Sequence, residues 1–200
     1  MPHNAVPPID LRSDTVTRPT AAMRRAMADA EVGDDVIEGD PTTRRLEAIT
    51  AEMLGKDLAL FFPSGTMANQ AAIWLHSTPG TEAFVDADSH IVHWELAGTA
   101  ALAGVQLRPV NSAGPVMRAA DLGASFRTPS IDAPEPSLVC VENTHNGAGG
   151  VVTSLNDMRA LYEVARAARL PLHLDGARLW NASVATRTSL ADFAACADTV

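Results

Sequence analysis

The sequence predicts an α/β fold built on a mostly parallel sheet. From residue 58 onward, short apolar segments alternate with longer segments whose apolar residues recur at helical spacing. The apolar segment 137–141, for example, is followed by a helical segment at 154–168 and then by the apolar segment 171–174. Polar clusters come directly after several apolar segments, as is typical of the carboxyl ends of parallel strands. Strands separated by helices favour right-handed crossover connections.

Composition narrows the class of protein. The 200 residues suffice for one domain with a substantial core, and the net charge is −9, with no basic cluster. Nucleic acid and an anionic membrane surface are therefore not expected as partners. The sequence contains neither a secretion-signal pattern nor an apolar run long enough to span a bilayer. Cys140 and Cys196 are isolated in apolar surroundings, so we expect buried free thiols and a cytoplasmic protein.

The beginning of the chain is expected to form an extended arm. Three prolines within the first ten residues leave little room for regular structure. We therefore divide the chain into an N-terminal arm at 1–19 and one domain at 20–200.

Helices are expected where a capping residue precedes an amphipathic stretch. Thr20, Asp40 and Ser154 are candidate N-caps, and Pro41 and Gly55 mark the first position and the end of the second helix. The expected helices lie at about 20–30, 41–54, 64–76, 91–103, 118–123, 154–168 and 189–195.

Short apolar segments rich in β-branched or aromatic residues predict the strands. The expected strands are 58–62, 83–85, 105–110, 137–141 and 171–174, with 197–200 as the opening of one more.

Asp175 lies in the segment 171–181, on which the functional interpretation of the whole sequence depends. It follows the strand 171–174 and precedes Gly176 and Arg178. A buried carboxylate needs a partner, because an unpaired one is costly to desolvate. One interpretation is a structural ion pair with Arg178. The other is a carboxylate that faces the pyridine nitrogen of pyridoxal phosphate (PLP), keeping it protonated so that the ring accepts electrons.

Three other polar clusters are expected at the same edge of the sheet. Ser64, Gly65 and Thr66 precede a helix, where free N–H groups and the helix dipole favour a phosphate, although a plain helix cap by Ser64 or Thr66 is the more frequent explanation of such a motif. His90 and His145 each follow a strand, and His145 also suits a simple turn. Four polar clusters at one edge favour a ligand site over purely structural roles.

A metal site is the alternative interpretation of one cluster. Carboxylate and imidazole side chains recur there at short spacing, at Asp86, Asp88, His90, His93 and Glu95. We expect no metal, because zinc sites usually show ligand pairs on rigid elements together with a second, distal pair.

Six segments together resemble the low-specificity L-threonine aldolases, which belong to the fold-type I PLP enzymes and to the wider grouping of aromatic-amino-acid β-eliminating lyases. The segments are 10–17, 32–36, 63–67, 89–91, 142–146 and 175–179. The match keeps their order and runs from residue 9 to the last residue. The resemblance implies the three-layer α/β/α large domain of PLP-dependent transferases, with pyridoxal 5'-phosphate as cofactor.

The resemblance also implies which residues hold the cofactor. Ser64, Gly65 and Thr66 would bind its phosphate through helix N-terminal amides. His90 would stack on the pyridine ring, and Asp175 would hold the ring N–H.

Other roles follow from the same resemblance. Arg178 would approach both the cofactor's phenolic oxygen and the substrate carboxylate, and Ser13 would add a carboxylate contact. His145 would lie near the substrate β-hydroxyl. His90 or His145 would take the hydroxyl proton, since neutral imidazole titrates near working pH.

Two departures from the family pattern are evident. Ile37 and Glu38 stand where the family usually has Tyr-Gly, so this acidic loop is expected to make different contacts. The chain has a single lysine, Lys56, in a turn before the amino end of a strand, where we expect a solvated surface side chain. The Schiff-base lysine of the family follows the strand that opens at 197–200. We therefore expect a C-terminally truncated large domain, without that lysine and without the small C-terminal domain.

The expected activity is PLP-dependent retro-aldol cleavage of L-threonine or L-allo-threonine to glycine and acetaldehyde, in a homotetramer. The chain alone is expected to be inactive. The alternatives are a PLP-dependent β-eliminating lyase, an aldolase for another β-hydroxy-α-amino acid, a catalytically dead α/β domain that binds a ligand or a partner subunit, and a metal hydrolase.

Overall fold

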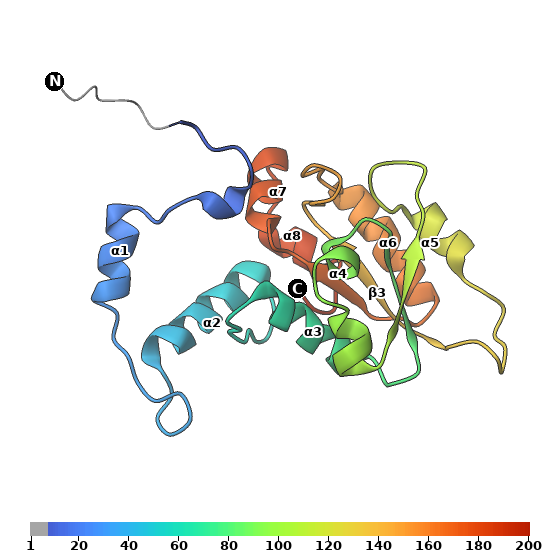
Figure 1. Cartoon of the computed structure of the whole chain (residues 1–200), viewed down its shortest axis with the longest axis horizontal. Coiled ribbons are helices and arrows are strands. Elements are labelled where there is room, and N and C mark those ends of the chain that lie inside the picture. Colours follow the sequence, from blue (N-terminus) through green and yellow to red (C-terminus); the bar gives the residue numbers. More distant parts are fainter. Residues whose placement is uncertain (1–7) are drawn as a thin grey trace. The chain divides into compact units, whose positions relative to one another are not determined.

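The computed structural model describes residues 8–200, so residues 1–7 of the expected arm lie outside the described part. By its internal contacts the chain divides into two compact units, one up to Leu46 and the other from Glu47 to Val200. Figure 1 shows the elements in chain order. The division into an arm at 1–19 and a domain at 20–200 stays a prediction.

The unit up to Leu46 is organised by side-chain caps. It contains η1 (Asp14–Val16), α1 (Ala21–Ala28) and the start of α2 (Pro41–Leu54). Thr20 Oγ1 accepts a hydrogen bond from Met23 N. Asp40 accepts from Thr43 N at 2.7 Å and from Gly33 N at 2.9 Å, so one carboxylate caps α2 and closes the preceding loop. Both predicted helices are confirmed.

The unit from Glu47 onward is built on a parallel sheet with strand order β2-β1-β3-β4. Its strands are β1 (Glu82–Asp86), β2 (Gln106–Val110), β3 (Pro136–Glu142) and β4 (Leu172–Asp175). Thr199 forms a parallel bridge with His173, so the chain end runs beside β4. The four strands expected after residue 80 are therefore confirmed.

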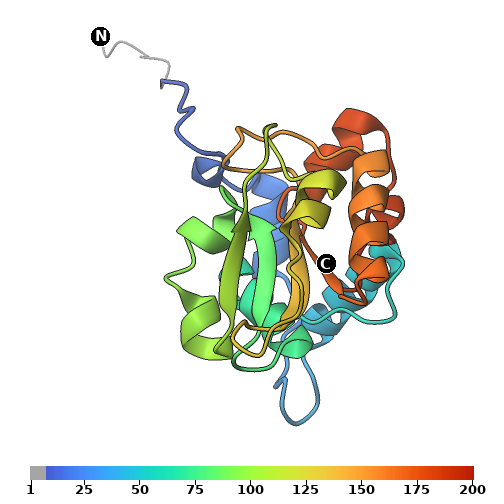
Figure 2. The ribbon, with the colours of Figure 1, turned by 90° about the vertical axis from the view of Figure 1, so that its right-hand side faces the viewer.

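Four helices contribute buried side chains to one face of this sheet. They are α5 (Ala119–Ser125), α6 (Leu155–Ala167), α7 (Leu179–Thr186) and α8 (Leu190–Ala194). In Figure 2 the orange helix among them runs alongside the strands. Phe84, Val139 and Leu172 lie in the same buried cluster as Leu161 and Phe193 of these helices. Each fully buried apolar side chain of this kind contributes about 1.5–3 kcal/mol.

The alternate residues of the strands point to the opposite face. Ala83, Val85, Leu138 and Cys140 form a second buried cluster with Ile73. That face carries α3 (Gly65–His76), α4 (His90–His93) and the π-helix η2 (Thr99–Ala103). The three-layer α/β/α architecture is thus confirmed. Because side chains alternate along a strand, Leu172 and Leu174 face α6 while His173 and Asp175 face α3.

Two expected elements differ in the structure. The segment 58–62 is not a strand: Leu58 and Leu60 are exposed, and Phe61 N donates to the Glu47 carboxylate. No described strand pairs with this segment, and a strand without a partner leaves its backbone groups unsatisfied.

The expected helix at 91–103 is broken. It ends at His93, and Leu96 and Ala97 adopt positive φ angles of 55° and 56° before η2 begins. The break places the Glu95 carboxylate against side-chain amides of α3, so tertiary contacts override the local helical pattern.

Helix α7 is not predicted from the sequence. Arg178 occupies its N-cap position without a side-chain capping hydrogen bond, so the usual starting signal is lacking. None of the helices in residues 8–200 has the length and apolarity that crossing a bilayer requires.

Candidate functional site

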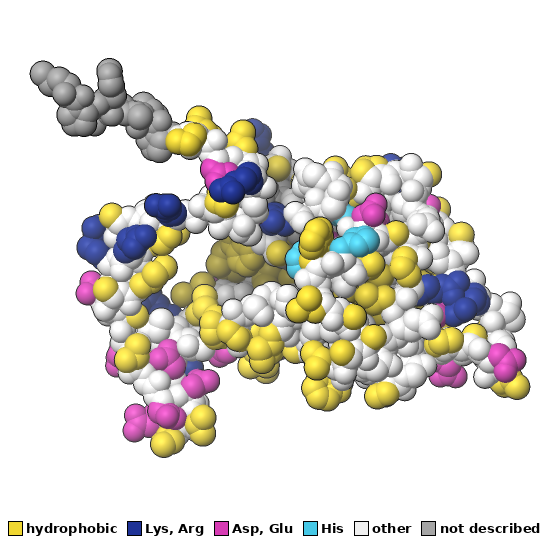
Figure 3. Space-filling view, viewed as in Figure 1, with side chains coloured by type: hydrophobic (Ala, Val, Ile, Leu, Met, Phe, Trp, Pro, Cys, Tyr) yellow, Lys and Arg dark blue, Asp and Glu magenta, His cyan; other side chains and the backbone are white. Residues whose placement is uncertain are grey.

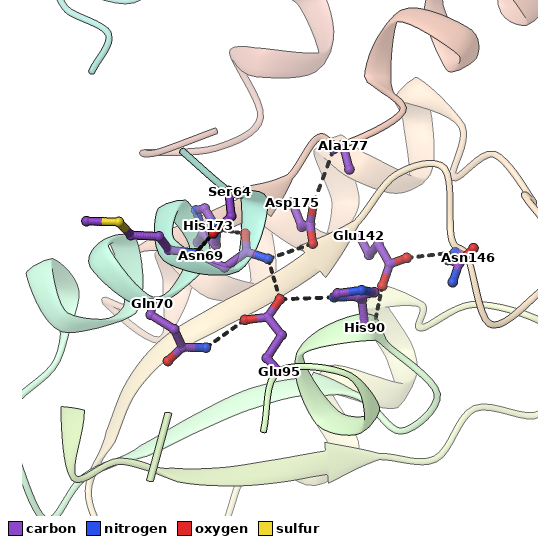
Figure 4. Close-up of polar contacts among 11 residues, drawn as sticks. Ser64, Asn69, Gln70, His90, Glu95, Glu142, Asn146, His173, Asp175 and Ala177 are labelled. Carbon is purple, nitrogen blue, oxygen red and sulfur yellow. Dashed lines mark hydrogen bonds and ion pairs between the residues drawn. The ribbon is translucent and has the colours of Figure 1, made fainter. Parts of the chain in front are cut away.

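Asp175 ends β4 and is held by two donors. Its Oδ2 accepts from Asn69 Nδ2 at 2.8 Å, and its Oδ1 accepts from Ala177 N at 3.1 Å (Figure 4). The side chain is buried, with the whole residue 8% exposed. The carboxylate is therefore fixed at the carboxyl end of the strand, as the sequence predicts.

His90 lies beside this carboxylate. It begins α4, and its Nδ1 lies 3.0 Å from Glu95 Oε1. Ligand atoms of His90, Glu95 and Asp175 all lie within 4.8 Å of one another. The His90 side chain is 36% exposed, whereas that of Glu95 is fully buried. Histidine side chains are visible on the surface of the chain (Figure 3).

Glu142 fixes the backbone around His90. This buried residue ends β3, and its Oε2 accepts from His90 N while its Oε1 accepts from Asn146 N, both at 2.7 Å. The position of His90 is thus set from the neighbouring strand, through a charge-assisted hydrogen bond.

The N-terminus of α3 lies close to the same carboxylate. Ser64 is its N-cap, with Oγ accepting from Met67 N at 3.2 Å. A Cβ added to Gly65 would meet no atom within 4 Å, so space is open there. Asn69, which contacts Asp175, follows Gly65 by four residues, or about 6 Å along the helix. The first-turn amides of Gly65 and Thr66 lack intrahelical acceptors and suit an anion.

His145 lies close to the carboxylate of Asp86. Its Nδ1 accepts from Ala148 N at 3.1 Å, and its Nε2 lies 3.2 Å from Asp86 Oδ1, without hydrogen-bond alignment. The Asp86 carboxylate raises the pKa of His145; burial opposes this shift, and Glu142 adds to it. The ring is buried, so its expected contact with substrate stays a prediction.

The remaining site residues also stay predictions. Ser13 belongs to the unit up to Leu46, where it is the N-cap of η1 and accepts from Thr15 N. Arg178 is half-buried and directly precedes α7. Among residues 8–200, the group with ligand-like spacing is His90, Glu95 and Asp175, which differs from the set that the sequence suggested for a metal.

Lys56 is not the solvated surface side chain that was expected. Its Nζ donates to Ala197 O at 2.6 Å, and burial lowers its pKa. Asp198, the next residue, accepts from the backbone N of Leu172 at the start of β4. Lys56 is therefore tied near the amino end of β4, whereas Asp175 lies at the carboxyl end. The lysine is held there because its aliphatic stem is half-buried and its head finds a carbonyl.

Three polar residues around the site were not assigned to it from the sequence. Asn69 and Gln70 of α3 both donate to Glu95, which the sequence suggested only as a metal ligand. All three are buried. Adjacent amides within an otherwise apolar helix were the available signal, since buried polar groups need partners.

A buried carboxylate, an imidazole and an open helix N-terminus thus converge at one edge of a parallel sheet. This arrangement defines an α/β protein with a ligand site at the carboxyl ends of its strands. A carboxylate, an imidazole and free backbone N–H groups together have the chemistry that suits a flat, cationic aromatic ring carrying an anionic group.

Comparisons with known proteins give the family. Residues 10–200 match the model of the Beta-eliminating lyase family. Low-specificity L-threonine aldolase 1 of Arabidopsis thaliana is 43% identical over 196 residues, which cover 96% of this chain and 55% of that protein. The low specificity L-threonine aldolase of Escherichia coli O157:H7 is 40% identical over 183 residues, covering 91% and 54%. A solved structure of Leishmania major threonine aldolase superposes with a TM-score of 0.75 at 24% identity, covering 88% and 52%.

The chain belongs to the Beta-eliminating lyase family. Enzymes of this family depend on PLP, which confirms the cofactor class that the resemblance implied. The chain spans about half the length of the curated relatives it matches.

Proposed function

We propose that the protein containing this chain is a PLP-dependent aldehyde-lyase that cleaves L-threonine or L-allo-threonine to glycine and acetaldehyde. The observation that carries the proposal is the convergence of Asp175, His90 and the N-terminus of α3 at one edge of the sheet. Similarity to two L-threonine aldolases at 40% identity or more supports the choice of reaction.

The chain's own residues would hold the cofactor in three places. Asp175 would accept the ring N–H, His90 would lie against the ring face, and the amides of Gly65 and Thr66 would bind the phosphate, with Ser64 shaping the turn. When bound, PLP supplies an electron sink for the electron pair released by carbon–carbon cleavage. Asp175 supports this chemistry because its fixed negative charge favours a protonated ring nitrogen.

Substrate handling would fall to a second set of residues. Arg178 and Ser13 would bind the substrate carboxylate, and Arg178 would also approach the cofactor's phenolic oxygen. His90 would accept the β-hydroxyl proton at Nε2, because Nδ1 faces the Glu95 carboxylate. His145 would approach the same hydroxyl, with Asp86 behind its ring.

We propose that residues 1–200 alone show little or no turnover. Lys56 is the single lysine of the sequence, and its Nζ is bonded to Ala197 O near the opposite end of β4. The cytoplasmic location and the homotetramer belong to the same proposal, on the family resemblance.

Product analysis tests the reaction. The full protein, loaded with PLP, is incubated with L-threonine and with L-allo-threonine, and the products are quantified. Equal amounts of glycine and acetaldehyde support the proposal. A keto acid with ammonia identifies a β-eliminating lyase instead, and turnover only with another substrate such as phenylserine identifies a different aldolase. PLP binding without turnover of any of these identifies a binding domain.

A further inference from the structure

A single side-chain amide, that of Asn69, connects two buried carboxylates of the site, those of Asp175 and Glu95. Asn69 Nδ2 donates to Asp175 Oδ2 and to Glu95 Oε1, both at 2.8 Å (Figure 4). An amide nitrogen carries two hydrogens, so each carboxylate receives one of them. Two carboxylates this close repel each other, and a donor shared between them holds both in place.

A contact to the oxygen of the Asn69 amide fixes the orientation of the amide. Asn69 Oδ1 lies 3.1 Å from His173 Nε2, and His173 Nδ1 lies 2.9 Å from Thr199 Oγ1. Burial, opposed by the charge of Asp175, lowers the pKa of His173 to about 4, so the ring carries one proton at neutral pH. That proton is on Nε2, because the carbonyl oxygen can only accept. Nδ1 then accepts from the Thr199 hydroxyl.

Thr199 in turn has a donor available. His76 Nε2 lies 3.0 Å from Thr199 Oγ1, so the hydroxyl donates to His173 while it accepts from His76. The donor and the acceptor are therefore fixed for every hydrogen bond in the series that leads from His76 to the carboxylates of Asp175 and Glu95. A flipped Asn69 amide would turn its oxygen toward two carboxylates and its N–H groups toward the protonated Nε2 of His173.

Through Glu95, these hydrogen bonds also determine which ring nitrogen of His90 carries a proton. Its carboxylate accepts from Asn69, from Gln70 Nε2 at 2.7 Å and from His90 Nδ1 at 3.0 Å. An ionised carboxylate only accepts, so His90 must carry a proton on Nδ1. Nε2 makes no hydrogen bond to any residue that the structure describes, and it is left as the basic nitrogen of a partly exposed ring.

We propose that Asn69 is a positioning residue. It holds the Asp175 carboxylate in place and, through Glu95, keeps His90 in the tautomer that is protonated on Nδ1 and free to accept a proton at Nε2. The part that concerns Asp175 rests on the proposed function, whereas the tautomer of His90 needs no ligand.

Nitrogen-15 NMR of the histidine rings tests the proposal in the full protein without cofactor. We expect single tautomers at neutral pH: Nδ1–H for His90 and Nε2–H for His173. This measurement needs no substitution, and the opposite tautomer at either ring overturns the proposal.

Substitutions then distinguish the role of Asn69 from that of the adjacent Gln70. Asn69→Leu keeps the approximate shape of the side chain and removes all three hydrogen bonds, whereas Gln70→Leu removes a hydrogen bond to Glu95 and none to Asp175. We expect Asn69→Leu to give His90 a mixture of tautomers. It should also raise the dissociation constant for PLP, followed by visible absorption, about tenfold or more, because a hydrogen bond to a charged group is lost. Gln70→Leu should raise this dissociation constant less than Asn69→Leu does, because the hydrogen bond from Asn69 to Asp175 remains.

The exposed Asn156 at the start of α6 provides the matched control, as Asn156→Leu. Wild-type tautomers together with wild-type PLP affinity in Asn69→Leu overturn the proposal. If His90 changes tautomer in Asn69→Leu but the wild-type protein binds no PLP, the positioning role stands and the proposed function fails.

Discussion

At the scale of single residues, Glu142 shows how much of the site depends on one buried acceptor. Its two oxygens accept from the backbone N–H groups of His90, the first residue of α4, and Asn146, in the turn after β3. The site therefore depends on Glu142 although this residue presents no group to a ligand. Backbone donors of this kind have no other acceptor once they are buried.

Replacing Glu142 with glutamine tests this dependence. The glutamine keeps one acceptor oxygen and turns an NH₂ group toward the other backbone N–H, so one buried donor loses its partner. We expect the free energy of unfolding to fall by about 1–3 kcal/mol, measured by urea denaturation. Glu163→Gln on the exposed side of α6 is the control and should change little. An equal effect of the two substitutions would contradict the role of Glu142.

Residues at strand ends were the ones that the sequence could predict. Asp175 and His90 each follow an apolar strand, and parallel strands bring such positions to one edge. Asn69 and Gln70 could not be assigned in this way, because the sequence does not reveal which helix face meets Glu95. Lys56 was misjudged because its acceptor, Ala197 O, is distant in sequence.

At the scale of elements, α7 ends in a conformation that its sequence does not favour. Arg187 is its C-cap, with φ of 57° and ψ of 31°. This left-handed region costs a residue with a Cβ about 1–2 kcal/mol, a cost that glycine avoids. The strain is local, since Arg187 is exposed.

Arg187→Gly should therefore stabilise the protein. We expect a gain of about 0.5–1 kcal/mol in the free energy of unfolding, since part of the relief is offset by the greater freedom of glycine in the unfolded chain. Arg187→Ala is the matched variant, because it removes the same side chain but keeps the Cβ. A gain of equal size with alanine would show that charge rather than backbone strain is responsible.

Elements with a local signal were predictable, and those without one were not. Asp40, Ser154 and Ser189 each cap a helix that was expected near its observed position. The break after His93 depends on the buried Glu95 contacts, which arise only when α3 packs on the sheet. The segment 58–62 has a strand-like composition, but a strand also needs a neighbour, and local sequence does not supply that information.

At the scale of the whole molecule, buried and half-buried histidines make the free energy of unfolding depend on pH, with opposite signs. His173 and His76 have lowered pKa values, chiefly through burial. As pH falls, these rings therefore take up protons in the unfolded chain at a higher pH than in the folded chain, and the free energy of unfolding decreases. His145 has a raised pKa, so its contribution is fully present below about pH 6.5 and is lost as pH rises through its folded value. Of the two histidines with lowered pKa values, His173 has the larger shift, with a folded pKa of about 4.

Replacing His173 with glutamine isolates that contribution. In the wild-type protein, stability present above about pH 6.5 should decline toward the folded pKa of about 4, by on the order of 1–3 kcal/mol. Glutamine places an N–H donor near Asn69 Oδ1, as His173 Nε2 does, but does not titrate. We expect His173→Gln to be less stable than wild type at pH 7, since the Thr199 hydroxyl loses its acceptor, and to show a smaller decline between pH 6.5 and 4.5. Urea denaturation across this range measures both effects, with the exposed His93→Gln as the control. A wild-type decline in His173→Gln would place the titrating group elsewhere and would remove the reason for assigning the proton of His173 to Nε2 alone.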